Sequence, residues 1–412
     1  MRSLKPPPNL RHMKNVFSFL LCFLIVSTIS AQKKYDFEFT IASDAFEKER
    51  KIYVHVPERY YENENESFNV IYVLDGQGRV YYNNAKSVID YLVWSYQISP
   101  SIVVGIHSDN RGTEFVPKNR SLDLNDENNT GQAHQLQQHI EDEIFPLVSE
   151  NFRINDFKAL IGHSRGGAFV ATTLFSDKKD LFDAYLAISP GMHYLDNQIL
   201  NDATKMIQEK ATFNKFYYCT HGTVGSLEKY FKPQVEMLDS LFKVHPNPTI
   251  VWGKKEIEAT SHWGCVAPSL VFGMLEMNRA YVADQHLVDV FAENKGKTLA
   301  HQIQSYHAQQ KKILGFTFPL DAPSLRYYGN QQSEYEQHDR AIELFDMSLE
   351  IDPEQINVYL SKAWSQRQLG QNENARTTLL KAKEELGKSS KFSEERVNRW
   401  NKNIDQQLSE IE

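Results

Sequence analysis

The chain has 412 residues, 41% of them hydrophobic and 12% aromatic, a composition typical of a globular protein with one large domain and a smaller one. The formal net charge is −8, and positive side chains occur as scattered pairs rather than as a basic cluster. Because nucleic-acid phosphates require a basic surface, these values argue against a nucleic acid as the partner.

The N-terminus has the pattern of a secretory signal peptide. A basic start at Met13-Lys14 precedes an apolar run over residues 16–26 and a small-residue exit that ends at Ala31. Such segments direct export and are then removed, so we expect residues 1–31 to comprise an N-terminal extension and a signal peptide cleaved after Ala31. The mature protein would then be periplasmic or secreted, with no stable membrane span. An uncleaved anchor is the alternative, although the apolar run is short for a bilayer.

From Tyr35 to about Asn278 the sequence alternates between strand and helix patterns. Short apolar or alternating runs bounded by turn residues predict strands. The predicted strands are Asp36–Ala42, Lys51–Val56, Asn69–Leu74, Ser101–Ile106, Phe157–Ile161, Ala184–Ile188, Asn214–Cys219 and Thr249–Gly253. Helices are predicted near Gln132–Val148 and Tyr230–Phe242. Continuous apolar strands between helices indicate an α/β fold, with a mostly parallel sheet and helices on both faces.

The strand that begins at Phe157 runs into Gly162-His163-Ser164-Arg165-Gly166, and a helix pattern of small and apolar residues follows. This strand–turn–helix setting is the sequence form of a nucleophile elbow, in which a tight turn requires small residues beside the serine. We therefore predict that Ser164 is a catalytic nucleophile at the positive end of the following helix. The alternative is an ordinary glycine-rich turn with a capping serine.

In this fold class the chain order of the catalytic residues is serine, acid, histidine. His262 follows the last predicted strand, where the base is expected, and we interpret it as the catalytic base. His221 is the rival base, whereas His163 points away from the nucleophile and is predicted to be structural. Glu228 is the first carboxylate after the Asn214–Cys219 strand and is the preferred orienting acid. The alternatives are a Ser-His dyad without a carboxylate, or one of the acids Asp239, Glu256 and Glu258.

An oxyanion hole requires two backbone N–H groups that point at the same oxygen. One is predicted to be the amide of Arg165, directly after the nucleophile. The second should come from the loop after the third predicted strand, where Gly76 or Gln77 offers an amide. The alternative for this loop is a simple turn formed by Asp75 and Gly78.

After about Gly315 glycine and β-branched residues become rarer, and a helical repeat begins. Ala341–Phe345 and Ala375–Leu379 stand 34 positions apart, and Ile351-Asp352-Pro353 ends the first unit, where proline stops a helix. This spacing is similar to that of a tetratricopeptide repeat, with small residues where paired helices pack closely. Because only two units are visible, we expect this region to dock on the preceding domain or to be capped by Phe392–Ile411.

Removal of the signal peptide would leave two cysteines, Cys219 and Cys265. Both fall near the ends of neighbouring predicted strands, and an exported protein can hold such a pair as a disulfide. We hypothesise that they pair. The alternative is two buried free thiols.

Several motifs in a fixed order resemble a known group of α/β-hydrolases. The motifs are Val73–Gln77, Val103–Ile106 with Asn110-Arg111 and Phe115–Pro117, Gly162–Gly167, Ile188–Pro190 and Ser261-His262. Over about residues 35–280 they resemble the putative esterase family, which contains enterochelin (siderophore) esterases and relatives of S-formylglutathione hydrolase. Several exported members also carry a tetratricopeptide-like tail. The resemblance implies hydrolysis of a carboxylic ester or thioester through an acyl-serine, with no metal or organic cofactor, and it adds Arg111 to the candidate substrate-binding residues.

The sequence departs from the siderophore esterases at one motif. Those proteins often carry aromatic residues after Ser-Pro, whereas this chain has Gly191-Met192-His193-Tyr194. The substrate therefore stays open between a siderophore-like and another acyl ester. His193 and Tyr194 are candidates to line an acyl or alcohol pocket, and packing is the alternative role for Tyr194.

The mechanism that these residues predict is hydrolysis of a small-molecule ester, in which His262 takes the proton of Ser164 as the serine attacks. One alternative is an acyltransferase with the same machinery. Another is a non-catalytic binding protein that recruits a protein partner through its repeats. The predicted organisation is an extension and signal peptide (1–31), an α/β-hydrolase domain (32–280), a helical linker (281–320) and a tetratricopeptide-like helical region (321–412).

Overall fold

The structure of the chain is a computed structural model. It describes residues 34–62, 66–123, 125–279, 281, 293, 296–318 and 321–411. The predicted signal peptide lies outside these residues, and so does a large part of the predicted 281–320 linker. Among the described helices, none combines the length and the apolar character that a bilayer crossing requires.

An eight-stranded sheet forms the centre of the structure, with the strand order β1-β2-β4-β3-β5-β6-β7-β8. The strands are β1 (Asp36–Ser43), β2 (Lys48–His55), β3 (Phe68–Leu74), β4 (Ser101–Ile106), β5 (Ile154–His163), β6 (Ala184–Ile188), β7 (Lys215–Gly222) and β8 (Ile250–Ile257). Strand β2 runs antiparallel to both of its neighbours, and the pairs from β4 to β8 are parallel. This sheet confirms the predicted α/β class. Strands β3, β4 and β6 are buried along their whole length, because helices cover both faces.

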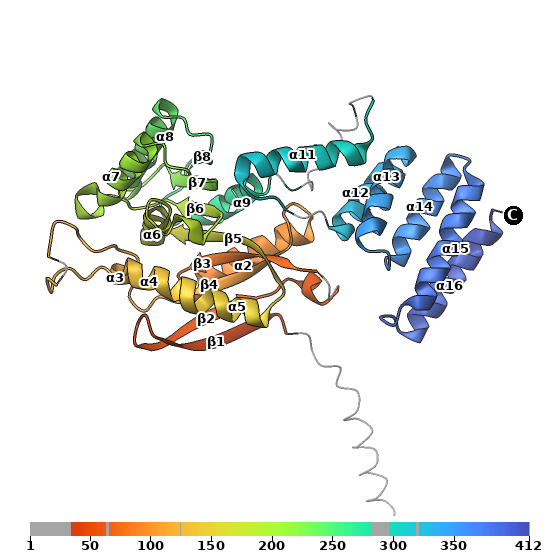
Figure 1. Cartoon of the computed structure of the whole chain (residues 1–412), viewed down its shortest axis with the longest axis horizontal. Coiled ribbons are helices and arrows are strands. Elements are labelled where there is room, and N and C mark those ends of the chain that lie inside the picture. The colour runs from red at the N-terminus through yellow and green to blue at the C-terminus, as the bar shows by residue number, and fades with distance from the viewer. Residues whose placement is uncertain are drawn as a thin grey trace, which may run out of the picture.

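Helices from different parts of the chain cover the two faces of the sheet (Figure 1). One face is covered by α4 (Ala133–His139), α5 (Phe145–Asn151), α6 (Arg165–Leu174), α7 (Tyr194–Gln208) and α8 (Glu228–Val244). The other face is covered by α2 (Arg79–Trp94), α9 (Val266–Met277) and α11 (Leu299–Leu314). The predicted helix near Gln132–Val148 is interrupted by a π-helical turn at Ile140–Ile144. Pro146 explains the interruption, because it lacks the N–H that a continuous helix needs.

The C-terminal region is entirely helical within its described residues, as predicted (Figure 1). Its helices are α12 (Ala322–Glu334), α13 (His338–Ile351), α14 (Ile356–Gln368), α15 (Asn372–Lys388) and α16 (Glu394–Ser409). The repeat positions lie where neighbouring helices approach closely: a Cβ on Gly329 of α12 would come within 2.5 Å of the Phe345 ring on α13. The assignment of these helices to tetratricopeptide repeats stays a prediction.

The first of these helices docks on the sheet domain. Arg59, which is buried, forms ion pairs with Asp321 at 2.6 Å and with Glu66 at 2.7 Å. The Tyr328 hydroxyl donates to the Tyr96 carbonyl at 2.9 Å. Helices α14 to α16 have a hydrophobic core of their own, which α16 completes. Both predicted outcomes, docking and capping, therefore occur in one region.

The two cysteines do not form a disulfide. Cys219 and Cys265 are both free and buried. Cys219 belongs to the core on the α8 side of the sheet and Cys265 to the core on the α9 side, so the sheet separates the two thiols. Burial raises the pKa of each thiol to about 12. The pairing hypothesis is wrong, and the alternative of two buried thiols holds.

Candidate active site

Ser164 occupies a strained turn between β5 and α6. Its dihedral angles are φ 60° and ψ −115°, a backbone conformation that costs a residue with a side chain on the order of 1–3 kcal/mol. The turn needs glycine at Gly162, because a Cβ there would lie 2.4 Å from the Gly166 carbonyl group. At Gly166 itself a Cβ would meet its nearest neighbour, a Leu74 methyl group, at an ordinary 3.5 Å. The turn therefore requires glycine at Gly162, whereas Gly166 has room for a Cβ.

His262 and Glu228 lie in contact on the edge formed by the carboxyl ends of the strands. Glu228 begins α8 and His262 lies in the loop after β8, and both side chains are buried. The distance from His262 Nδ1 to Glu228 Oε1 is 3.0 Å. Because an ionised carboxylate only accepts hydrogen bonds, this contact requires the proton on Nδ1 and leaves Nε2 as the basic nitrogen.

Two further groups hold the Glu228 carboxylate in place. The Gly222 amide donates to Oε2 at 3.0 Å, and the Ser189 hydroxyl donates to Oε1 at 2.6 Å. Burial alone would raise the pKa of Glu228, but the hydrogen bonds from His262, Ser189 and the Gly222 amide outweigh it and lower the pKa. Glu228 is therefore ionised at neutral pH and accepts the hydrogen bond from the imidazole.

Ser189 is a site residue that was not identified from the sequence. It follows β6, and its hydroxyl lies 2.9 Å from His262 Nδ1 as well as 2.6 Å from Glu228. Its φ of 41° is again left-handed. The Ser-Pro pair after β6 was part of the family motif, which was the available signal for this position.

The loop after β3 forms the turn that was considered as an alternative. The Gly78 amide donates to the Asp75 carbonyl at 2.8 Å, and the Gly76 amide donates to the Ile106 carbonyl at 2.8 Å. The sheet therefore uses the Gly76 amide, which cannot also face an oxyanion. The amides of Gln77 and Arg165 have no hydrogen-bond partner within the described part of the chain, so these two stay candidates for the oxyanion hole.

The guanidinium group of Arg111, a predicted substrate-binding residue, is hydrogen-bonded to other groups of the protein. Its Nε and Nη2 atoms donate to the two Asp75 oxygens at 3.0 Å and 2.9 Å. Nη2 also donates to the His163 carbonyl at 3.2 Å. Arg111 thus ties the loop after β3 to the elbow, and about a third of its side chain (34%) stays exposed.

His193 and Tyr194 lie beside the catalytic candidates. Phe231 bridges the two groups: its ring centroid is 5.6 Å from that of His193 and 5.0 Å from that of His262. The Tyr194 hydroxyl accepts a hydrogen bond from Arg165 Nε at 3.2 Å. Burial, followed by the charge of Arg165, lowers the pKa of His193. The geometry thus brings both predicted pocket residues to the rim of the site.

The other candidates have partners elsewhere. His163 is buried, its Nε2 donates to the His262 carbonyl at 2.9 Å, and burial lowers its pKa to about 3. His221 donates from Nδ1 to the Gly222 carbonyl at 2.9 Å. Asp239 contacts Lys243 and Lys254, Glu256 pairs with Lys232, and Glu258 is exposed.

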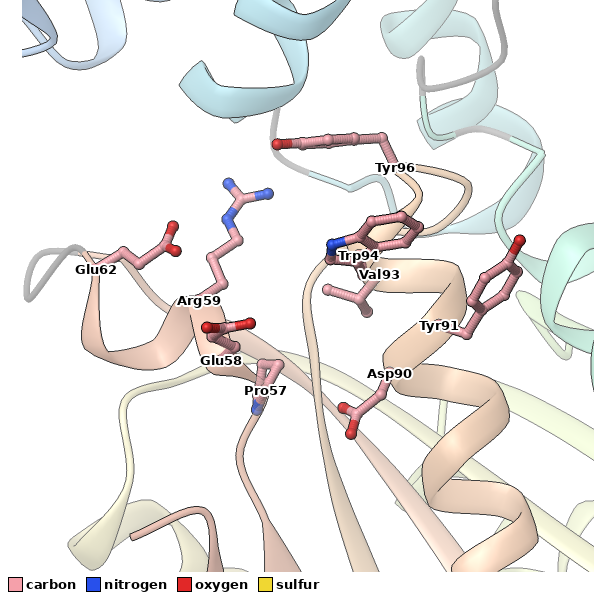
Figure 2. Close-up of a pocket in the computed structure, with 9 residues that line it drawn as sticks. All are labelled: Pro57, Glu58, Arg59, Glu62, Asp90, Tyr91, Val93, Trp94 and Tyr96. Carbon is pink, nitrogen blue, oxygen red and sulfur yellow. The ribbon is translucent and has the colours of Figure 1, made fainter. Parts of the chain in front are cut away.

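A cavity elsewhere in the sheet domain contains none of the candidate catalytic residues. Its volume is about 350 Å³, and Figure 2 shows Arg59 and Trp94 on opposite sides of it. Its remaining lining residues are Pro57, Glu58, Glu62, Asp90, Tyr91, Val93 and Tyr96. It lies where α2 ends, beside the amino ends of the parallel strands, whereas Ser164 lies at their carboxyl ends. Ligands of parallel α/β sheets bind at the carboxyl ends, so this cavity is not the candidate active site.

Known proteins resemble the chain in sequence and in fold. A siderophore enterobactin esterase from Emericella nidulans is 33% identical over 132 residues, which are 32% of this chain and 42% of that relative. An IroE-like serine hydrolase from Shewanella oneidensis has a TM-score of 0.63 at 19% identity, covering 77% of this chain and 99% of that structure. An uncharacterised protein from Capnocytophaga ochracea has a TM-score of 0.59 at 13% identity, covering 91% of this chain and 99% of that structure.

At such low identities the two structures establish the fold alone. The chain matches less than half the length of the curated relative, so that protein's activity is not transferred here. The family match is broader, because residues 43–301 fit the Esterase family model, described as Putative esterase. Since these residues are more than half of the 412-residue chain, the chain belongs to the Esterase family.

Proposed function

We propose that this chain is a serine esterase that hydrolyses a carboxylic ester through an acyl-serine intermediate. The observation that carries the proposal is the buried contact of 3.0 Å between His262 Nδ1 and Glu228, on the same sheet edge as the strained Ser164. Family membership and the siderophore esterase relative support an ester as the substrate.

The first chemical step is attack by Ser164 on the ester carbonyl. His262 Nε2 takes the hydroxyl proton, since Nδ1 already carries a proton for Glu228. The amides of Arg165 and Gln77 hold the oxyanion, and the protonated imidazole then passes its proton to the leaving alcohol. Water, activated by the same nitrogen, releases the acid and restores Ser164.

The rim of the site supports a substrate with an aromatic group. The rings of Phe231 and Trp263 lie 5.0 Å and 5.4 Å from that of His262, and His193 lies on the other side of Phe231 at 5.6 Å. The Arg165 guanidinium lies over the Tyr194 ring at 5.5 Å from its centroid. Aromatic rings stack on such surfaces, and a guanidinium favours an anionic or hydroxylated ring. Comparing kcat/KM for aromatic and aliphatic esters of equal size tests this substrate class, which equal values would exclude.

The nucleophile is tested with the Ser164→Ala variant, using short p-nitrophenyl esters and a fluorophosphonate probe. We expect kcat/KM to fall by a factor of about 10⁴ or more and the covalent probe adduct to disappear, while the far-ultraviolet circular dichroism stays unchanged. Ser226→Ala is the matched control, because Ser226 is exposed in the loop before Glu228. Turnover in Ser164→Ala within tenfold of the unmodified chain would overturn the assignment.

We also propose that the protein is exported, on the pattern of residues 13–31. The N-terminus of protein purified from the periplasm or the medium should then be Gln32. Recovery of the full-length chain from the cytoplasm would contradict this proposal.

A further inference from the structure

His221, at the carboxyl end of β7, has one ring nitrogen without a hydrogen bond. The side chain is fully buried, and Nδ1 donates to the Gly222 carbonyl at 2.9 Å. A carbonyl oxygen only accepts, so the proton of a neutral imidazole lies on Nδ1 and Nε2 has a lone pair. Among the described residues Nε2 has no hydrogen-bond partner, and it lies 3.6 Å from Glu236 Oε1 and 3.9 Å from Glu256 Oε2.

Three separate elements bring these groups together. His221 and Glu256 are register partners on the parallel strands β7 and β8, so their side chains leave the same face of the sheet. Helix α8 covers that face and supplies Glu236. The nitrogen and the two carboxylate oxygens all lie within 4.8 Å of one another.

The spacing of the three atoms is close to that of metal ligands. In a tetrahedral zinc site with bonds of about 2.0–2.1 Å, two ligand atoms are about 3.3 Å apart. The observed distances of 3.6 Å and 3.9 Å from Nε2 to the carboxylates are longer, and the two carboxylate oxygens lie within 4.8 Å of each other, so an inward movement of Glu236 and Glu256 would bring the three atoms to ligand spacing.

The charges at this position also favour a cation. A lone pair and two carboxylates that face one another repel unless a positive charge lies between them. Lys254 pairs with Glu236 and Lys232 pairs with Glu256, but neither contact gives His221 Nε2 a partner. Both lysine side chains are partly exposed, and Lys254 also contacts Asp239 at 3.3 Å, so each ammonium keeps another carboxylate or water as a partner when a second cation binds.

We propose that His221, Glu236 and Glu256 bind one divalent transition-metal ion, with zinc as the best fit and water as the remaining ligand. An imidazole with two carboxylates suits zinc, whereas calcium and magnesium prefer oxygen ligands alone. The ion would fasten α8 to β7 and β8. His221 adjoins Gly222, whose amide holds Glu228, so the ion supports the helix end that presents the candidate acid.

This ion is structural and takes no part in the ester chemistry, so the expectation of a metal-free reaction is unaffected. Its test is independent of the proposed esterase, because binding and thermal unfolding are measured rather than turnover. The full mature chain is freed of metal with a chelator and titrated with Zn²⁺ by calorimetry. We expect one equivalent to bind and the melting temperature to rise.

Variants at the two partly exposed carboxylates avoid disturbing the buried histidine. Glu236→Gln and Glu256→Gln should each weaken Zn²⁺ binding by about tenfold or more and remove the gain in melting temperature. Lys232→Gln should strengthen binding, because it removes a competing cation, whereas Lys229→Gln on the same helix is the control and should change nothing. The proposal is overturned if the unmodified chain binds no Zn²⁺, or if both glutamine variants bind it as tightly.

Discussion

The carboxyl edge of the sheet and the C-terminal helices differ in where they place backbone strain. Three non-glycine residues with left-handed φ values follow strands directly: Asp75 (62°) after β3, Ser164 (60°) after β5 and Ser189 (41°) after β6. In the described part of α12 to α16 the left-handed residues are Glu336 (59°) and Gly370 (72°). These two lie at turns between helices, where a left-handed residue is the ordinary end of a helix.

The two regions also bury different groups. The sheet edge buries ionisable side chains, including Glu228 and His262, whereas the polar side chains buried in the described part of α12 to α16 are uncharged ones such as Ser348 and Gln366. Strained turns and buried polar groups cost stability but fix the positions of reacting atoms. We therefore expect substitutions at the edge to reduce activity more than stability, and substitutions between the helices to do the reverse.

Among changes that keep the Ser164 nucleophile, the largest effect on activity is expected for Glu228→Gln. The amide keeps the size of the side chain, but it is neutral and can present a donor to His262 Nδ1, which disfavours the tautomer with a basic Nε2. We expect kcat/KM for an activated ester to fall by a factor of about 10³–10⁴, measured under conditions where the far-ultraviolet circular dichroism is unchanged.

The matched control for this change is Glu258→Gln, an exposed glutamate in the loop that leads to His262. Its kcat/KM should stay within about twofold of the unmodified value, since surface changes rarely alter either folding or a buried site. If Glu258→Gln were the more damaging variant, the acid would be misassigned and the contrast between edge and surface would fail.

Secondary structure was predictable from the sequence where local pattern and tertiary packing agree. The predicted bounds of β4 and β6 coincide with the observed ones, because both are short, fully apolar runs between turn residues. Helices α2, α7 and α9 were not predicted. In α7 the left-handed residues Leu195–Asn197 interrupt the first turn before the helical spacing of Ile199, Ala203 and Ile207 begins. Helix α9 is apolar on most of its surface, which obscures its helical periodicity.

The chain order of the motifs anticipated the contact between Glu228 and His262, because parallel strands bring their carboxyl ends to one edge. It could not anticipate which loop amide is free, since the Gly76 amide is used by a hydrogen bond to β4 that depends on strand register. The cluster of His221 with Glu236 and Glu256 could not be predicted either, because it depends on the register of β7 and β8 and on the position of α8. Contacts that depend on strand register could not be predicted from this single sequence.

Gly329→Leu, between α12 and α13, is expected to have a smaller effect, which lowers stability rather than activity. A Cβ at this position already lies 2.5 Å from the buried Phe345 ring, so the two helices must move apart. We expect the free energy of unfolding to fall by about 1–3 kcal/mol and amide exchange to rise in α12 and α13, with kcat/KM unchanged.

Gly387→Ala in α15 is the control for this change, because no atom of the described residues would contact a Cβ at that position within 4 Å. Alanine there should stabilise the helix by up to about 1 kcal/mol. A loss of esterase activity in Gly329→Leu that matches its loss of stability would show that the two regions are coupled rather than separate.

A comparable effect on stability, which depends on pH, is expected at the sheet edge in acid. Burial, followed by the charge of His262, lowers the pKa of His163 from 6.5 to about 3 in the folded chain. The unfolded chain therefore binds a proton first, so the contribution of His163 is complete above its unfolded pKa and is lost as the pH falls toward the folded value. Between about pH 7.5 and about pH 5 this loss amounts to about 2 kcal/mol.

His163→Gln should remove this dependence, because the amide can still donate to the His262 carbonyl but does not titrate. Urea denaturation at the two pH values should then show a fall in unfolding free energy that is about 2 kcal/mol smaller than in the unmodified chain. His134→Gln, at an exposed histidine, should leave the fall unchanged. If the unfolding free energy of His163→Gln fell by the same amount as that of the unmodified chain, the buried imidazole would not be the cause of the loss of stability in acid.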